Sequence, residues 1–309
     1  MSGFVLCKLP KTGLGNQLFP LVKAAVFAKL NDLPLIVVGY HQLKIGPYLR
    51  GEKIKRRYKG YFTFQKNILS EQADYFSLWR HRNYEKIIEP SIEELTENKK
   101  AEKQFIFSAI PHWSDYFAGL RENRELAISL FWEMINKSIL QKLETQPSPC
   151  IGIHIRMGDF RKLQEGEDFK KVGTVRTPED YFINTINTIR QINGKQLPVS
   201  VFTDGYRDEL KKLFALPGIK MIEGNEDIID MLLLSKSKII ITSAGSTFSY
   251  WAGFLSNAPL IMHPDHLHQP VRLPEINQLC YEGPLLKDSP NILLQKNIKQ
   301  LIYEENSTT

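Results

Sequence analysis

An imidazole and a guanidinium lie two residues apart near the middle of the chain, at His154 and Arg156. In residues 151–156 isoleucines alternate with other side chains, which is the pattern of a strand with one buried face. Open α/β sheets bind ligands at the carboxyl ends of their strands. Because a guanidinium is permanently charged and offers five donors in a planar fork, it suits a phosphate. We therefore predict that Arg156 binds an anionic group and that His154 contacts the same ligand.

Two carboxylates near predicted strand ends have roles that the sequence leaves open. Asp159 follows Arg156 by three residues, so it can orient the guanidinium as a structural ion pair or take part in the chemistry. Asp204 ends the predicted strand 199–203. It can accept hydrogen bonds from a nucleotide base or ribose, or it can form an ordinary Asp-Gly turn.

Hydroxyl groups gather directly after the apolar strand 239–241. The candidate ligand contacts in this segment are Ser243, Ser246, Thr247 and Phe248. We expect Ser246 to cap the following helix, and the first N–H groups of that helix to form an anion site. Simple capping is the alternative, but it needs only one of these hydroxyl groups. The segment is therefore a second candidate for phosphate contact.

A glycine-containing loop precedes the first predicted helix. Gly13 and Gly15 begin like a dinucleotide fingerprint, but Leu18 stands at its third glycine, so the fingerprint fails. Asn16 and Gln17 are polar side chains at the helix start and are candidates for ligand contact. Capping of the helix by Asn16 is the alternative.

Residues 112–117 combine His, Asp and aromatic side chains after a predicted strand. His112 and Asp115 could face an acceptor substrate and act as a general base. A packed aromatic loop is the alternative. The sequence is therefore compatible with both a catalytic and a purely structural role for this segment.

A metal site is not expected. Residues 263–268 contain three histidines and an aspartate, but no partner cluster is evident, so a structural or substrate-contacting loop fits better. The chain has no Asp-x-Asp motif to hold a divalent ion on a diphosphate. Arg156 and a helix N-terminus could neutralise a diphosphate instead.

Short strands and helices alternate along both halves of the chain, which predicts parallel, doubly wound sheets. Strands are expected at 4–8, 35–38, 105–107, 150–156, 199–203, 219–222, 238–242 and 260–262, and helices at 18–30, 120–143, 177–192, 207–214, 226–236 and 246–257. Thr177 is expected to cap its helix. Residues 146–149, with two prolines, look like a linker.

We therefore predict an α/β fold of two Rossmann-like domains that face each other across a cleft. The first domain would span residues 1–147, and the second would span residues 148–289. Residues 290–309 would form a C-terminal helix that is a candidate to cross back to the first domain.

The composition is that of an ordinary soluble globular protein, with 42% apolar and 24% charged residues among 309. The net charge of +6 does not separate nucleic-acid binding from attraction to an anionic substrate or a membrane. The basic run 53–59 is a candidate for peripheral membrane contact, with a solvated loop as the alternative. Three widely spaced cysteines argue against a disulfide framework. We find neither a signal peptide nor a membrane-spanning run, so we expect a cytoplasmic protein. We also expect no nucleic-acid partner.

Taken together, these motifs resemble those of the bacterial α-1,2-fucosyltransferases (glycosyltransferase family 11), within the fucosyltransferase superfamily that includes the protein O-fucosyltransferases. The matching segments are residues 13–19, 113–117, 152–160, 179–182, 202–204 and 246–253, in the family's order. The resemblance implies a GT-B fold and GDP-β-L-fucose as donor. It makes 1–147 the domain on the acceptor side and 148–289 the domain that binds the nucleotide sugar through its GDP. It also implies inverting transfer to a glycan hydroxyl, α-1,2 to galactose, with no cofactor and no required metal.

The resemblance implies roles in donor binding for individual residues. Arg156 would bind the diphosphate, Asp204 would lie near the nucleotide's base, and Asn16 would lie beside the donor phosphate. The hydroxyl segment from Ser246 would form another part of the donor site. Many relatives carry a second arginine where this chain has Met157. Strand alternation places Met157 on the face opposite Arg156, so the phosphate contact is expected to survive.

For the transfer step, Arg156 would stabilise the charge that develops on the leaving GDP. Any base that accepts the proton of the acceptor hydroxyl would be Asp115, Asp159 or His112. Two other functions stay open. One is a non-catalytic protein of this fold that binds GDP or a glycan, and the other is a glycosyltransferase that uses a different nucleotide sugar.

Overall fold

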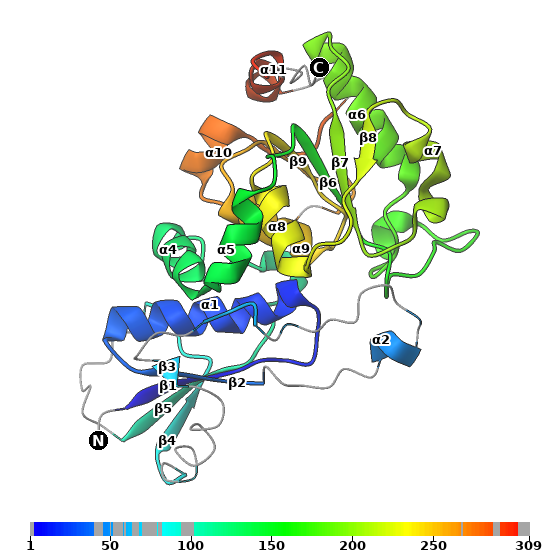
Figure 1. Cartoon of the computed structure of the whole chain (residues 1–309). Coiled ribbons are helices and arrows are strands. Elements are labelled where there is room, and N and C mark those ends of the chain that lie inside the picture. Colours follow the sequence, from blue (N-terminus) through cyan, green and yellow to red (C-terminus); the bar gives the residue numbers. More distant parts are fainter. Residues whose placement is uncertain are drawn as a thin grey trace. The chain divides into compact units, whose positions relative to one another are not determined.

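The structure, a computed structural model, describes residues 3–39, 46–49, 51, 58, 60–63, 68–69, 79, 82–93, 102–266, 268–286 and 291–301. The chain forms two compact units (Figure 1). The first comprises Met1–Ile45 and Arg56–Lys142, and the second comprises Gly46–Lys55 and Leu143–Thr309. Each unit has its own parallel sheet, as the alternating pattern predicts.

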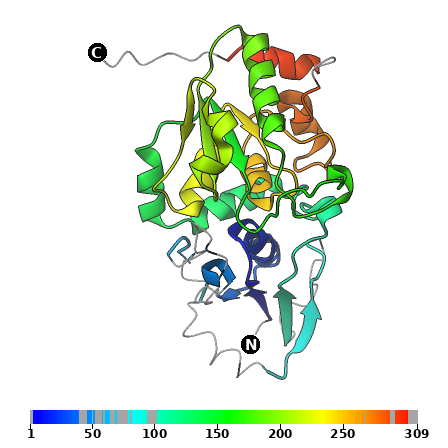
Figure 2. The same ribbon diagram turned by 90° about the vertical axis from the view of Figure 1, so that its right-hand side faces the viewer.

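A five-stranded sheet with the order β3-β2-β1-β5-β4 forms the centre of the first unit, and all its strands are parallel. The strands are β1 (Phe4–Lys8), β2 (Leu35–Val38), β3 (Ile68–Leu69), β4 (Glu85–Ile88) and β5 (Lys103–Phe107). Figure 2 shows β4 and β5 side by side, pointing the same way. Because the strands are parallel, their carboxyl ends share one edge of the sheet, where ligands bind in folds of this kind.

Helix α1 (Leu14–Asn31) connects β1 to β2 and packs on the sheet. Its apolar face includes Phe27, whose ring centroid lies 5.0 Å from that of Phe105 on β5. The helix begins before the expected residue 18, and Gly13 rather than Asn16 occupies its N-cap position. The interpretation of Asn16 as a cap is therefore wrong, and Asn16 lies in the first turn of the helix.

The helix expected over residues 120–143 is interrupted. Two helices replace it, α4 (Arg124–Met134) and α5 (Lys137–Glu144). Between them Ile135 has an extended backbone and pairs with Phe62 in an isolated antiparallel bridge. The side chain of Asn136 then accepts the N–H of Ser138 at 3.0 Å, which caps the new helix start. The apolar periodicity runs through this break and therefore cannot reveal it.

The second unit contains a six-stranded parallel sheet with the order β11-β10-β9-β6-β7-β8. Its strands are β6 (Ile151–Ile155), β7 (Val199–Thr203), β8 (Ile219–Met221), β9 (Ile239–Ile241), β10 (Leu260–Ile261) and β11 (Glu282–Gly283). Its helices are α2 (Gly46–Leu49), α6 (Glu179–Asn193), α7 (Lys211–Phe214), α8 (Asp227–Ser235), α9 (Thr247–Leu255), α10 (Pro274–Cys280) and α11 (Ile292–Lys299). From β6 the chain proceeds outward to β7 and β8, and then returns to β9 on the other side of β6. The strand order therefore reverses between β6 and β9.

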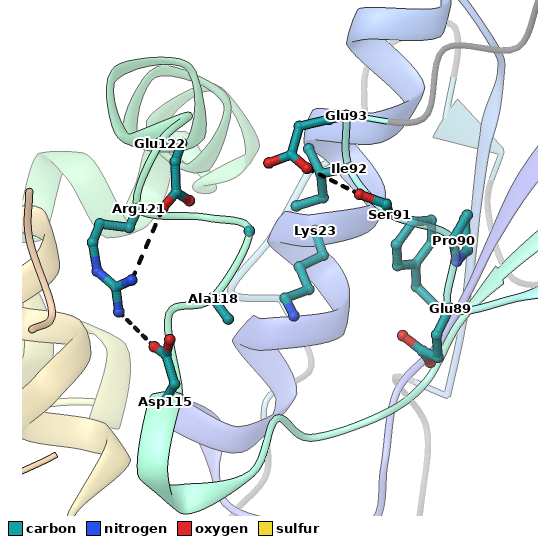
Figure 3. A pocket seen from close by; sticks show the side chains of 12 residues that line it. Lys23, Glu89, Pro90, Ser91, Ile92, Glu93, Asp115, Ala118, Arg121 and Glu122 are labelled. Atoms are coloured by element: carbon teal, nitrogen blue, oxygen red, sulfur yellow. Dashed lines mark hydrogen bonds and ion pairs between the residues drawn. The ribbon is translucent and has the colours of Figure 1, made fainter. Parts of the chain in front are cut away.

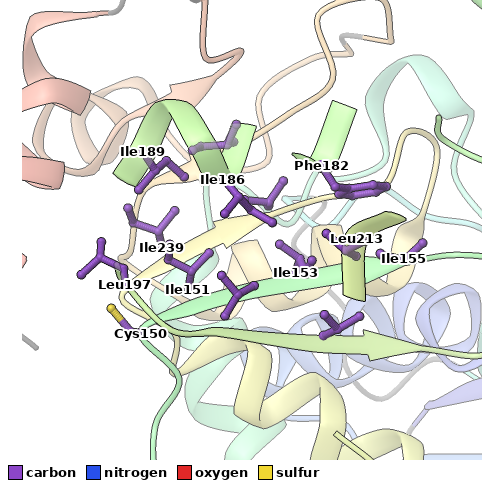
Figure 4. Packing of buried hydrophobic residues seen from close by; sticks show 14 of the residues in the cluster. Cys150, Ile151, Ile153, Ile155, Phe182, Ile186, Ile189, Leu197, Leu213 and Ile239 are labelled. Carbon is purple, nitrogen blue, oxygen red and sulfur yellow. The ribbon is translucent and has the colours of Figure 1, made fainter. Parts of the chain in front are cut away.

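The isoleucines of β6 lie in the buried core of the second unit, as their alternation predicts (Figure 4). The shared cluster includes Ile151, Ile153 and Ile155 of β6 with Phe182, Ile186 and Ile189 of α6. On the opposite face of the strand, a Cβ atom added to Gly152 would lie 2.1 Å from Oγ of Ser237, just after α8. Helical segments therefore approach both faces of β6, and glycine permits the closer approach.

The C-terminal helix α11 packs within the second unit. Its residues Leu294 and Ile298 belong to the same buried cluster as β6. The side chain of Asn193, at the end of α6, donates to the carbonyl of Ile298 at 2.7 Å, and α11 lies beside α6. Residues 291–301 thus bury their apolar face against α6, and the candidate return of the C-terminal segment to the first domain stays a prediction. The expected helix start at Pro290 lies outside the described residues.

Three further expectations have outcomes in the structure. Thr177 does not cap α6; its hydroxyl accepts the N–H of Ala244 at 2.9 Å and so ties the loop before α6 to the loop after β9. Cys7 and Cys150 are buried free thiols, in line with the expected lack of a disulfide framework, and burial raises the pKa of both. Of the basic run 53–59 only Tyr58 is described.

No helix in the described part of the chain is long and apolar enough to cross a membrane.

Candidate functional site

Two carboxylates hold the guanidinium of Arg156. Its Nη1 donates to Oδ2 of Asp204 at 2.5 Å, and its Nη2 donates to Oδ1 of Asp159 at 2.5 Å. The two partners differ in exposure, since the side chain of Asp204 is 8% exposed and that of Asp159 is 34% exposed. Arg156 itself remains 19% exposed, and its Cζ lies 5.7 Å from the centroid of the Phe160 ring.

The parallel register of β6 and β7 produces the inner ion pair. Ile155 is opposite Thr203, and the Thr203 hydroxyl donates to the Ile155 carbonyl at 2.7 Å, so the next residues of both strands emerge together. The second oxygen of Asp204 accepts the N–H of Met157 at 2.7 Å. Asp204 thus uses both carboxylate oxygens to position the end of β6.

The turn after β6 is packed so closely that two positions near it, Gly158 and Gly205, have no room for a side chain. A Cβ atom added to Gly158 would lie 2.4 Å from Oδ2 of Asp204, which is the oxygen that binds Arg156. Met157 is buried in the core, on the side away from Arg156, as strand alternation predicts. A Cβ atom on Gly205 would lie 2.6 Å from Cγ of Met157. Position 157 is therefore committed to apolar packing and supplies no second cation.

His154 is almost completely buried and packs against the start of α9. Its ring stacks on Phe248 of α9 with centroids 4.6 Å apart, and its Nδ1 lies 3.3 Å from Oγ of Ser246. Burial lowers the pKa of His154 to about 3, an effect that Asp204 opposes and Arg156 reinforces. The imidazole is therefore neutral at physiological pH.

The hydroxyl segment after β9 is tied to the end of β6. The buried hydroxyl of Ser243 donates to the carbonyl of His154 at 2.8 Å and accepts the N–H of Arg156 at 2.9 Å. Ser246 occupies the N-cap position of α9, but its side chain makes no capping hydrogen bond and contacts His154 instead. The expected capping by Ser246 is therefore wrong. Thr247 begins α9 and is partly exposed, like Phe248, while Gly245 is exposed in a left-handed conformation at φ +68°.

These groups meet at the point where the strand order reverses. Arg156 follows β6, and the segment from Ser243 to Thr247 follows β9, so both lie at the carboxyl ends of the two strands that flank the reversal. Open α/β sheets bind ligands at this point. A guanidinium and the first N–H groups of α9 at one edge can stabilise a negatively charged group.

The first unit contains the other four predicted site residues. Gln17 is buried, and its amide donates to the carbonyl of Pro10 at 2.7 Å, so it fixes the loop after β1. Asn16 is partly buried beside it. His112 is exposed and accepts the N–H of Ser114 at the start of the short helix η1 (Trp113–Asp115). Asp115 accepts from Arg121 at 2.5 Å.

Asp115 also lines a pocket of about 390 Å³ in the first unit (Figure 3). Lys23 of α1 and Glu89, which follows β4, line the same pocket and are not among the residues singled out from the sequence. A signal for Lys23 exists, because it lies four residues from both Phe19 and Phe27, whose side chains are completely buried. A lysine at this spacing on an apolar helix face is unusual.

The described residues of the loop 263–268 make packing and ion-pair contacts with neighbouring segments of the second unit. The ring of His263 packs on Phe169 and Tyr181 at centroid distances of 4.8 and 4.6 Å, and burial lowers its pKa to about 4. Nζ of Lys170 lies 3.0 Å from Asp265. The loop thereby anchors the short helix η2 (Phe169–Lys171). Among the described residues, no group of three or more His, Cys, Asp or Glu side chains could hold a metal ion.

Comparison with known proteins places this chain in a family. The sequence profile described as Glycosyl transferase family 11 matches residues 52–262. An α-1,2-colitosyltransferase of Escherichia coli is 31% identical over 116 residues, which cover 36% of this chain and 37% of that protein. The match thus spans little more than a third of that relative.

Solved structures show the same fold. The fucosyltransferase NodZ from Bradyrhizobium superposes with a TM-score of 0.52 at 15% identity, over 87% of this chain and 100% of that chain. NodZ α-1,6-fucosyltransferase soaked with GDP-fucose gives the same TM-score and identity, over 85% and 95%. The α/β architecture with its parallel sheets is therefore the GT-B-like fold of these fucosyltransferases. Since the profile covers more than half of the sequence, this chain belongs to glycosyl transferase family 11.

Proposed function

We propose that this protein is an inverting fucosyltransferase that moves L-fucose from GDP-β-L-fucose to a hydroxyl group of a glycan, in α-1,2 linkage to galactose. The observation that carries the proposal is the position of Arg156 and the start of α9 at the strand-order reversal of the second unit. Membership of family 11 and the fold shared with NodZ support the fucose donor.

In the proposed donor site, the diphosphate binds to the exposed side of the Arg156 guanidinium and to the first N–H groups of α9. Thr247 and Phe248, both partly exposed, contact the donor, while His154 and Ser246 hold this segment from beneath. Ser243 fixes the distance between the two strand ends. Asp204 acts as a positioning residue, because Arg156 and Met157 occupy both of its oxygens.

The proposed reaction breaks the bond between the anomeric carbon of fucose and the β-phosphate oxygen of GDP. Negative charge develops on the leaving diphosphate, where Arg156 and the helix start stabilise it more strongly than in the ground state. An acceptor hydroxyl attacks from the opposite face and forms the new glycosidic bond with inversion. The hydroxyl proton passes to a base or to water, with Asp115, Asp159 and His112 as the candidate bases.

The test is incubation of the purified protein with GDP-fucose and measurement of GDP release, with and without lactose or N-acetyllactosamine. We expect release to depend on the acceptor, and linkage analysis of the product by NMR to show fucose at O2 of galactose. Binding of GDP without any release would instead support a non-catalytic nucleotide-binding protein.

A second donor follows from one observation, the 31% identity to the α-1,2-colitosyltransferase. Colitose is fucose without its 3-hydroxyl group, so the same diphosphate site would serve both donors. GDP-colitose therefore belongs in the donor panel beside GDP-fucose and GDP-mannose. A kcat/KM for GDP-colitose above that for GDP-fucose would make colitose the preferred sugar.

A further inference from the structure

The pocket of the first unit brings one lysine together with two anchored carboxylates (Figure 3). Lys23 extends from α1 into it, with Asp115 on one side and Glu89 on the other. Its ammonium group makes no hydrogen bond or ion pair with any residue that the structure describes. Burial lowers the pKa of Lys23, and the two carboxylates oppose this shift. Three N–H donors are thus available to a ligand.

Each carboxylate is fixed through one oxygen. Oε1 of Glu89 accepts the N–H groups of Ser108 and Ala109 at 2.6 and 2.7 Å, just beyond β5. Oδ1 of Asp115 accepts from Arg121 at 2.5 Å. Within the described residues, Oε2 of Glu89 and Oδ2 of Asp115 have no hydrogen-bond partner. The pocket therefore presents preorganised acceptors beside the donors of Lys23.

The backbone at Glu89 is also unusual. Its φ of +50° lies in the left-handed region, which non-glycine residues seldom adopt. Such conformations persist where the surroundings fix them, and they are concentrated at ligand sites. Here the two backbone N–H groups after β5 hold the side chain in place.

The chemistry of the pocket selects a class of ligand. Its cations, Lys23 and Arg121, face four carboxylates: Glu89, Glu93, Asp115 and Glu122. The net negative lining disfavours an anionic ligand, and the ammonium between Glu89 and Asp115 disfavours a metal ion. The volume of about 390 Å³ is within the range of small-molecule sites. Ile92 and Phe107 add apolar surface to this lining. Hydroxyl groups beside apolar C–H faces are the features of a neutral sugar.

We propose that this pocket binds one neutral sugar unit of the acceptor glycan, with Lys23 donating to its oxygens and Glu89 and Asp115 accepting from its hydroxyl groups. The assignment rests on the proposed function for the identity of the glycan as acceptor. Sugar binding by the pocket can nevertheless be measured without turnover. The two hypotheses can therefore fail separately.

The first experiment measures binding by saturation-transfer NMR on the full chain, with methyl β-D-galactopyranoside, lactose, N-acetyllactosamine and 3′-sialyllactose as probes. Lys23→Met keeps the length of the side chain but removes its donors. Lys29→Met is the matched control, since Lys29 is exposed on the same helix. We expect at least one neutral probe to bind the wild type and the control, and its affinity to fall about ten-fold or more in Lys23→Met, as for a lost charge-assisted hydrogen bond.

The second experiment measures GDP affinity by calorimetry and, with GDP-fucose, the KM for the same neutral probe. In Lys23→Met we expect the acceptor KM to rise with the loss of binding, while the affinity for GDP stays at the wild-type value. Equal binding of the neutral probes by Lys23→Met and wild type, absence of binding by every neutral probe, or preference for 3′-sialyllactose would each overturn the pocket assignment. Lys23-dependent sugar binding without GDP release from GDP-fucose would overturn the proposed reaction and leave the sugar pocket in place.

Discussion

Arg156 and Asp204 form an ion pair across the carboxyl ends of β6 and β7, with 2.5 Å between Nη1 and Oδ2. The pair is inward-facing, because Asp204 is only 8% exposed and also holds the N–H of Met157. Removing one partner of such a buried pair costs more than the pair contributes, because the other charge stays buried. Tests of this site therefore need substitutions that keep the charge or the shape.

Arg156→Lys keeps the positive charge but loses the planar donor fork. We expect kcat/KM for GDP-fucose to fall roughly 10- to 100-fold, as for the loss of one or two charge-assisted hydrogen bonds. Steady-state kinetics and GDP calorimetry give the measurement. Arg161→Lys is the control, since Arg161 is 44% exposed and pairs with Glu167. Near-normal turnover in Arg156→Lys would remove the diphosphate role from this residue.

Asp159→Asn separates the two roles that the sequence leaves open for this residue. Asp159 is the more exposed partner of Arg156, and its negative charge opposes a bound diphosphate. We expect GDP to bind more tightly to Asp159→Asn, by about two- to ten-fold, a gain of roughly 0.4–1.4 kcal/mol. Asp180→Asn, on an exposed carboxylate of α6, serves as the control. A large loss of kcat with unchanged GDP affinity would instead identify Asp159 as the base.

Gly158→Ala tests the close packing around the ion pair. The new Cβ would lie 2.4 Å from Oδ2 of Asp204, so the carboxylate or the turn must move. Overpacking of this kind costs about 1–3 kcal/mol, and displacement of Arg156 should also weaken GDP binding. Gly173→Ala is the matched control, because nothing lies within 4 Å of its added Cβ. Urea unfolding and GDP calorimetry on both variants measure the two effects, and equal behaviour would contradict the prediction.

The buried histidine makes stability depend on pH. Burial lowers the pKa of His154 to about 3 from an ordinary value of about 6.5, so the unfolded chain binds the proton more readily. His154 therefore costs no stability above about pH 6.5, and the free energy of unfolding falls as pH drops from about 6.5 toward 3. We expect His154→Gln to flatten this decline relative to wild type. Urea midpoints at pH 7, 6, 5 and 4 measure it.

The control for this pH dependence is His112→Gln, which changes an exposed histidine. Its decline should match that of the wild type. Equal slopes in His154→Gln and wild type would show that other groups cause the acid sensitivity. His263, whose pKa burial lowers to about 4, would then be the next residue to test.

Metal removal tests the source of positive charge in the proposed reaction. The guanidinium of Arg156 and the N-terminus of α9 can neutralise a diphosphate without a divalent ion. We therefore expect GDP release from GDP-fucose to continue at the same rate after treatment with EDTA. A loss of turnover that Mg²⁺ or Mn²⁺ restores would contradict metal independence.

Much of the second unit could be predicted from its sequence, because its signals are local. The alternation of residues 151–156 predicts a strand with one buried face whose end carries Arg156. The strand and the position of Arg156 are confirmed, but every residue of β6 is buried, so the expectation of a single buried face is wrong. The sequence offers Asp159 as an ion-pair partner of Arg156, and the structure confirms that contact, but nothing in the sequence indicates Asp204, which is 48 residues away. Only the register of β6 against β7 brings Asp204 to the guanidinium.

Other details depend on tertiary contacts that leave no local pattern. Thr177 and Ser246 both have the residue type of a helix cap, but Ala244 and His154 engage their hydroxyl groups instead. The break at Ile135 follows from a bridge to distant Phe62. The pocket around Lys23 likewise combines α1 with segments after β4 and β5, so no single motif marks it.

The central position of β6 has a consequence for how this protein becomes functional during synthesis. Its two neighbours, β7 and β9, are separated from it by unequal lengths of chain, and the hydroxyl segment after β9 emerges almost 90 residues after Arg156. A nascent chain that ends before α9 can form β6 and β7 but lacks the proposed anion site between β6 and β9. If that site binds the nucleotide as proposed, nucleotide affinity should arise late and abruptly during translation, and GDP should stabilise only chains that have already completed most of the second sheet.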